Sequence, residues 1–130
     1  MLAAMTDLSD VRVVVTGGTS GLGRAMADAL IGAGARVAIT GRDRARAGAV
    51  AAELGPDGVG IEMDVRDERS VHAGVDDAYE LLGGVDMLVN NAGIGMRTVN
   101  PRFMSDPLAF WEVPPSGFRD VVETKLTGSF

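Results

Sequence analysis

The chain has 130 residues, a formal net charge of −6 at pH 7, 46% hydrophobic and 23% charged residues, and no cysteine. These values are typical of one globular domain with a hydrophobic core, predicted here over residues 1–130. The acidic balance argues against a nucleic-acid partner, and the absence of cysteine excludes disulfides and thiol nucleophiles. No targeting signal or membrane span is evident, so we expect a cytoplasmic protein without a membrane partner.

Predicted strands and helices alternate in the first half of the chain. Residues 11–16 form a β-branched apolar run that ends at glycines, which indicates a buried strand. Apolar side chains then recur every three or four positions from Leu22 to a stop at Gly32, which predicts a helix. Residues 36–40 predict a second strand, and residues 44–54 predict a helix that ends at the turn signal GPDG.

The same alternation continues in the second half. Residues 59–63 predict a weaker strand, Asp67 is the candidate cap of the next helix, and residues 85–89 predict a fourth strand. Residues 94–115 contain four of the five prolines and no clear period, which predicts a long loop with room for one helical turn. Ser116 is the candidate cap of a last helix, within which the chain stops.

This order of elements predicts an α/β fold. Strands joined by helices of ten to fifteen residues favour right-handed crossovers and a parallel sheet with helices on both faces. The fourth strand would then be an unprotected edge, which invites pairing with further strands.

The stretch TGGTSGLG, residues 16–23, joins the first predicted strand to the first predicted helix. Free N–H groups and the helix dipole at such a turn attract an anion, so phosphate is the expected ligand. A magnesium-nucleotide P-loop is disfavoured because Arg24 and Ala25 stand where that motif needs Lys and Ser or Thr. A hydrolase elbow is disfavoured because GTSGL is not G-x-S-x-G. The remaining pattern is T-G-x-x-x-G-x-G, with a plain tight turn as the alternative.

Three further features follow the later predicted strands: Arg42, the pair Asp64 and Val65, and NNAG at residues 90–93. In open parallel sheets, ligands bind outside the carboxyl ends of the strands, so all of these features fall on one edge. Arg42 stands where a fold that prefers NAD carries an acidic residue. Its contacts to a 2′-phosphate would favour NADP by about tenfold or more, with a merely solvated arginine as the alternative.

In this order and spacing, TGGTSGLG, GR, DV and NNAG resemble the amino-terminal half of the short-chain dehydrogenase/reductase family. The resemblance covers nearly the whole chain and implies a Rossmann-like, doubly wound sheet whose carboxy-terminal strands are missing from this chain. It implies hydride transfer between NADP, with NAD as an alternative, and a small alcohol or carbonyl substrate. The implied cofactor-binding residues are Gly17, Thr19, Ser20, Gly21, Leu22, Gly23, Arg42, Asp64, Val65, Asn91, Ala92 and Gly93.

The resemblance also assigns roles within this set. The glycine loop would cradle the pyrophosphate, Asp64 and Val65 would meet the adenine, and residues 91–93 would meet the ribose closer to the nicotinamide. Asn90 and Thr16 are expected to tie strands and loop together by hydrogen bonds. A homodimer or tetramer is also suggested.

The family's catalytic pattern is incomplete in this chain. The resemblance implies a tyrosine acid, a lysine four residues later, a serine and a helix asparagine. The only tyrosine is Tyr79, interpreted as a partly buried helix residue, and the only lysine is Lys125, at the asparagine position. In a complete enzyme, Lys125 would place a second cation near the catalytic lysine; the alternative is a tolerated, solvent-reaching residue without a role in catalysis. We therefore predict no catalytic residue and no activity of the chain alone. The alternative function is a non-catalytic NADP-binding module or degenerate family member.

The remaining candidates indicate structure rather than chemistry. His72 is the only histidine and is expected to be solvated, so no metal site is predicted. Four aromatic residues in and beside the long loop are expected to pack beneath it, with a substrate or partner surface as the alternative. They are Phe103, Phe110, Trp111 and Phe118.

Overall fold

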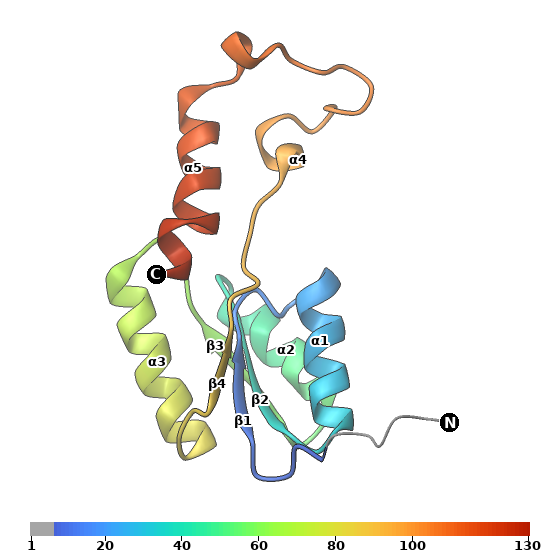
Figure 1. Cartoon of the computed structure of the whole chain (residues 1–130), viewed down its shortest axis with the longest axis vertical. Coiled ribbons are helices and arrows are strands. Elements are labelled where there is room, and N and C mark those ends of the chain that lie inside the picture. The colour runs from blue at the N-terminus through green and yellow to red at the C-terminus, as the bar shows by residue number, and fades with distance from the viewer. Residues whose placement is uncertain (1–6) are drawn as a thin grey trace.

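The computed structural model describes residues 7–130 and contains one parallel sheet in the order β3-β2-β1-β4 (Figure 1). The strands are β1 (Arg12–Val15), β2 (Arg36–Gly41), β3 (Gly58–Glu62) and β4 (Met87–Val89). The helices between them are α1 (Gly21–Gly32), α2 (Arg44–Leu54) and α3 (Glu68–Leu82). Beyond β4 follow α4 (Met96–Val99), η1 (Phe110–Glu112), α5 (Pro115–Lys125) and η2 (Thr127–Ser129).

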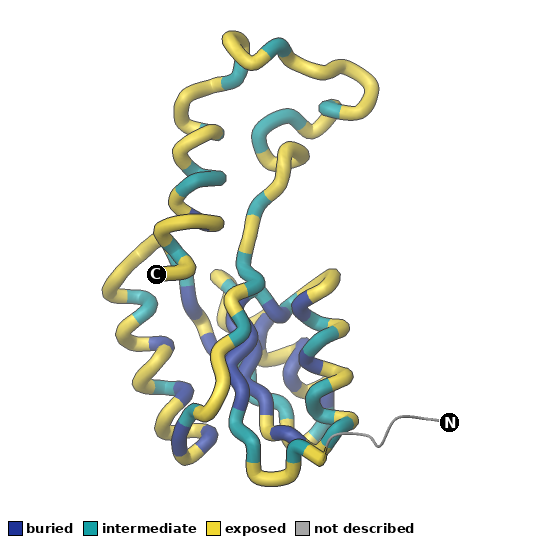
Figure 2. The backbone as a smooth tube through the Cα atoms, in the orientation of Figure 1, coloured by how far each residue is buried: buried dark blue, intermediate teal, exposed yellow. Residues whose placement is uncertain are grey.

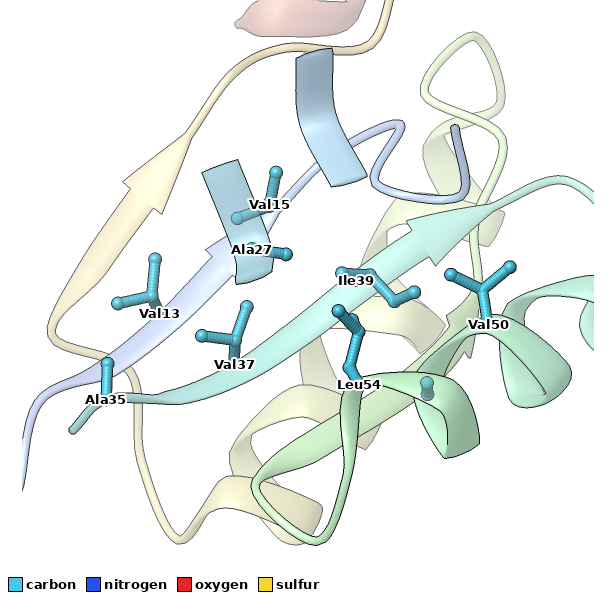
Figure 3. Close-up of a cluster of buried hydrophobic side chains, with 9 residues drawn as sticks. Val13, Val15, Ala27, Ala35, Val37, Ile39, Val50 and Leu54 are labelled. Carbon is cyan, nitrogen blue, oxygen red and sulfur yellow. The ribbon is translucent and has the colours of Figure 1, made fainter. Parts of the chain in front are cut away.

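Helices cover both faces of this sheet, so the predicted fold class is confirmed. On one face, β1 and β2 pack against α1 and α2 through a buried cluster (Figure 3). Its members are Val13, Val15, Ala27, Ala35, Val37, Ile39, Val50, Ala51 and Leu54. On the other face, Val14 and Ala38 pack with Ile61 against Ala78 and Leu82 of α3. Because both faces of the central strands are covered, the three buried residues of β1, at positions 13–15, are all valine and do not alternate with polar residues.

Two helix starts test the predicted caps. Asp67 caps α3, since its carboxylate accepts a hydrogen bond from the backbone N–H of Arg69 at 2.9 Å. The predicted cap at Ser116 is wrong, because α5 already begins at Pro115, with Pro114 in the cap position. Proline suits the first helical position, where its fixed φ is helical and no N–H is needed.

Residues 94–114 form an extended connection from β4 to α5, here called the arm (Figure 2). The predicted helical turn is present as α4, and a second turn, the 3-10 turn η1, follows within the arm. The expected packing of the aromatic residues is wrong for three of the four, since Phe110, Trp111 and Phe118 are 83%, 75% and 65% exposed. The rings of Phe110 and Trp111 meet edge to face, with centroids 5.1 Å apart. Only Phe103 is partly buried.

An ion pair joins the start of β1 to the turn before β4. Arg12 donates from Nε and Nη2 to the two carboxylate oxygens of Asp86, at 2.8 and 2.9 Å, and its backbone N–H donates to the same group at 2.9 Å. These hydrogen bonds from Arg12 lower the pKa of Asp86 from 3.8 to about 2.

Asp86→Asn is expected to change the pH dependence of stability. Because the pKa is lower in the folded state, the carboxylate stabilises the fold above its unfolded pKa and loses this effect as the pH falls from about 4 to 2. Asp86→Asn should therefore lower the free energy of unfolding at pH 7 and flatten its slope in that window, measured by urea unfolding at a series of pH values. Asp28→Asn, at another exposed carboxylate, is the control, and an unchanged slope in Asp86→Asn would contradict the expectation.

Candidate functional site

A pocket of about 390 Å³ opens at the carboxyl ends of the strands. It is lined by every predicted cofactor-binding residue except Gly21. Its other lining residues were missed by reasoning from the sequence: Thr40, Gly41, Arg46, Met63, Arg66, Ile94 and Thr124. The volume lies within the range of small-molecule sites, roughly 300–1,000 Å³.

The glycine turn has no room for a side chain at Gly17 and Gly23. Gly17 adopts φ +66°, and a Cβ added there would lie 2.8 Å from Cα of Ala92. A Cβ added at Gly23 would lie 2.5 Å from the carbonyl oxygen of Gly17 and would also clash with Nδ2 of Asn91. Gly21 does not line the pocket, but its φ of +55° shapes the turn. At Gly17 and Gly23 the turn therefore presents bare backbone to the pocket.

Two polar features of the pocket lack partners within residues 7–130. Ser20 precedes α1 in an extended conformation and makes no side-chain cap, so N–H groups of the first helical turn are left free for a ligand. At the end of β2, Oγ1 of Thr40 is buried without a hydrogen-bond partner in the same part of the chain. Buried hydroxyls are normally paired, so this atom suits a polar ligand or a water molecule.

The turn after β4 is fastened to the glycine turn through Thr16 and Asn91. Oγ1 of the buried Thr16 accepts hydrogen bonds from the backbone N–H groups of Asn91 and Ala92, at 3.0 and 3.1 Å. Nδ2 of Asn91 donates to the carbonyl oxygens of Thr16 and Gly17, at 3.0 and 3.1 Å. Nδ2 of Asn90 donates to the carbonyl of Ser129 at 3.2 Å. The predicted tying role of Thr16 is confirmed and is shared by Asn91, whereas Asn90 ties the turn after β4 to η2 rather than to the glycine turn.

Charge in the pocket is mostly positive. Arg42, Arg46 and Arg66 line it together with one carboxylate, Asp64. Hydrogen bonds from the Arg66 side chain lower the pKa of Asp64, with a smaller contribution from the charge of Arg42. The spacing of Arg42 and Arg46, four residues apart across a helix start, is the one signal that could have indicated Arg46 from the sequence.

None of the three side chains considered for chemistry lines this pocket. Tyr79 is 56% exposed on α3, so the expectation of a partly buried residue is wrong. Lys125 does not line the pocket, but its stem covers the NNAG turn, with Cε 3.2 Å from where a Cβ of Gly93 would stand. The side chain of His72 is 77% exposed, as expected of a solvated residue, and its Nε2 lies 3.8 Å from Oε1 of Glu68.

Residues 7–130 contain no group of three or more His, Asp or Glu side chains arranged to hold a metal ion. Over the same residues, no helix combines the length and the apolar character that crossing a membrane requires.

The parallel sheet, its crossover helices and the glycine turn at its carboxyl edge define a Rossmann-like α/β protein. A family model described as short chain dehydrogenase matches residues 11–130. The chain belongs to the short-chain dehydrogenase family.

Known relatives extend this assignment. The chain is 40% identical over 121 residues to the 3-oxoacyl-(acyl-carrier-protein) reductase FabG of Aquifex aeolicus, covering 90% of this chain and 45% of that protein. It is 42% identical over 81 residues to the sorbitol dehydrogenase of Cereibacter sphaeroides, covering 62% of this chain and 32% of that protein. The crystal structure of the 3-ketoacyl-(acyl-carrier-protein) reductase of Brucella melitensis complexed with NADH is similar, with a TM-score of 0.81 and 35% identity, over 94% of this chain and 46% of that one. The chain thus spans at most about half the length of these relatives.

Proposed function

We propose that this chain forms the dinucleotide-binding part of an oxidoreductase that transfers a hydride between a nicotinamide dinucleotide and a small alcohol or carbonyl compound. The observation that carries the proposal is that the glycine turn, Arg42, Asp64, Val65 and the NNAG turn all line one pocket. The bare backbone at Gly17 and Gly23, the uncapped start of α1 and the unpaired hydroxyl of Thr40 suit a ligand rich in phosphate and ribose oxygens. Membership of the family supports the class of reaction.

Different residues of the chain would contact different parts of the dinucleotide. The glycine turn and the start of α1 would hold the pyrophosphate, because their N–H groups and the helix dipole favour negative charge. Asp64 and Val65 would lie beside the adenine, and Ala92 and Gly93 beside the second ribose. Because Nδ2 of Asn91 is bonded to the glycine turn, any contact of Asn91 with ribose falls to Oδ1 or to the backbone.

The bound nicotinamide would supply or accept the hydride. This chain's own residues would bind and orient it, and none of them is proposed as the acid or base, since Tyr79 and Lys125 do not line the pocket. The relatives are named for different substrates, so we propose only the class of alcohol or carbonyl compound. A cytoplasmic location and a homo-oligomer remain predictions.

The test uses the natural full-length protein that carries this chain. Titration with NADPH and NADH should show binding, and a panel of ketones, aldehydes and 3-oxoacyl thioesters should oxidise the reduced nicotinamide. Failure to bind either dinucleotide would overturn the proposal. Binding without turnover of any substrate would instead favour a non-catalytic binding module.

Arg42→Ala tests the proposed preference for NADP. Arg42 lines the pocket at the end of β2 and is exposed, so its removal should leave the fold intact. Loss of a charge-assisted contact to the 2′-phosphate should weaken NADPH binding about tenfold or more, and NADH binding much less. Arg44→Ala is the matched control, because Arg44 is exposed two residues away and does not line the pocket. Equal weakening of both dinucleotides would argue against this role of Arg42.

A further inference from the structure

Helix α5 approaches the pocket only with its last turns. Thr124 is buried and lines the pocket, whereas the start of α5 lies away from the sheet, next to the arm (Figure 1). Near its end, the stem of Lys125 covers Gly93, and a Cβ at Gly128 would lie 2.8 Å from Cγ2 of Val65. One wall of the pocket therefore depends on how α5 is held.

Among residues 7–130, one ion pair links α5 to the sheet edge. Nη1 of Arg66 lies 3.6 Å from Oδ1 of Asp120. Asp120 stands one turn before Thr124, and Oγ1 of Thr124 donates to the Asp120 carbonyl at 2.7 Å. Arg66 therefore meets α5 at the turn next to the one that forms the pocket wall.

Arg66 is itself fixed on the sheet side. Its backbone N–H and Nε both donate to Oδ1 of Asp64 at 3.0 Å, and Nη2 donates to Oδ2 at 2.8 Å. A guanidinium is planar and rigid, so this two-pronged grip on Asp64 also fixes the direction of Nη1. The charges of Asp64, Asp120 and Glu123 all favour the charged form of Arg66 and contribute to raising its pKa, after the hydrogen bond to Asp64.

We infer that Arg66 is a positioning residue: anchored on Asp64 at the end of β3, it holds Asp120 and so keeps the Thr124 turn of α5 against the pocket. No contact of Arg66 with a reacting atom is needed for this role. The consequence for dinucleotide affinity rests on the function proposed above, whereas the consequence for the position of α5 does not. Through α5, the same link also restrains the carboxyl end of the arm.

Asp120→Asn removes the charge of this pair and leaves the Arg66–Asp64 bonds in place. Asp120 is partly exposed, so the variant should fold. In the natural full-length protein without ligand, we expect amide hydrogen exchange in residues 116–125 to accelerate about two- to fivefold, the range set by a partly exposed ion pair. Exchange in residues 21–32 of α1 should not change, and NADPH should bind about two- to fivefold more weakly.

Two further variants separate positioning from a general loss of charge. Asp120→Glu keeps a carboxylate within reach of Arg66 and should restore slow exchange. Arg119→Gln removes a charge from the same helix at an exposed residue that forms no ion pair within residues 7–130, and should behave like the unaltered protein. Equal exchange in Asp120→Asn and Arg119→Gln, or no rescue by Asp120→Glu, would overturn the inference. If the unaltered protein binds no dinucleotide, the proposed function fails, and the exchange rates alone decide the role of Arg66.

Discussion

Replacing Gly23 by alanine is expected to weaken both the fold and dinucleotide binding severely. The added methyl group would lie 2.5 Å from the carbonyl oxygen of Gly17 and would clash with Nδ2 of Asn91. Backbone cannot yield as a flexible side chain can, so the start of α1 and the glycine turn must move apart. Overpacking of this kind costs roughly 1–3 kcal/mol.

Gly23→Ala should weaken dinucleotide binding as well as stability. The same movement displaces Gly17 and Asn91, which line the proposed phosphate site, so affinity for NADPH should fall more than about tenfold. Urea unfolding and calorimetric titration measure the two effects separately.

A matched control exists in α2. Gly48 is also a helical glycine, but a Cβ added there meets nothing within 4 Å in the described part of the chain. Gly48→Ala should stabilise the protein by roughly 0.5–1 kcal/mol, because alanine is the better helix former, and should leave binding unchanged. If Gly23→Ala and Gly48→Ala behaved alike, the close approach of α1 to the glycine turn would be refuted.

Thr16→Val should produce the second large effect. Thr16 is buried, and its Oγ1 accepts hydrogen bonds from the backbone N–H groups of both Asn91 and Ala92. Valine has nearly the same shape but no acceptor, so both N–H groups lose their partner. An unsatisfied buried donor costs about 1–3 kcal/mol, and these two N–H groups are only partly buried, so we expect a loss of roughly 2–4 kcal/mol in the free energy of unfolding, measured in urea.

Thr16→Ser provides the comparison. Serine keeps the hydroxyl and loses only a methyl group, so most of the stability should remain. Hydrogen exchange of the Asn91 and Ala92 amides should accelerate in Thr16→Val and stay slow in Thr16→Ser. A valine variant as stable as the serine variant would show that these bonds contribute little.

The core and the glycine turn could be predicted because their signals are local. Burial on both faces requires an unbroken apolar strand such as β1, and the backbone that approaches Ala92 at Gly17 tolerates no side chain. Asp67 caps the helix that directly follows it. Ser116 failed as a cap because a neighbouring residue, Pro115, suited the first helical position better.

Contacts between segments that are distant in the sequence could not be predicted from such local signals. Arg66 forms an ion pair with Asp120, 54 positions further along the chain, and Asn91 forms a hydrogen bond with Thr16. No rule of sequence spacing relates the two residues of either pair. The exposure of Phe110 and Trp111 likewise depends on where the arm lies, since apolar character alone favours burial.

Residue spacing and glycine positions thus determine the order of strands and helices, the parallel sheet and the edge at which a ligand can bind, because these follow from local backbone preference and from burial. The pairing of Arg66 with Asp120, the unpaired hydroxyl of Thr40 and the wall that α5 adds to the pocket arise only when the chain folds back on itself. Long side chains have many rotamers and several partners of opposite charge, and tertiary packing selects one of them.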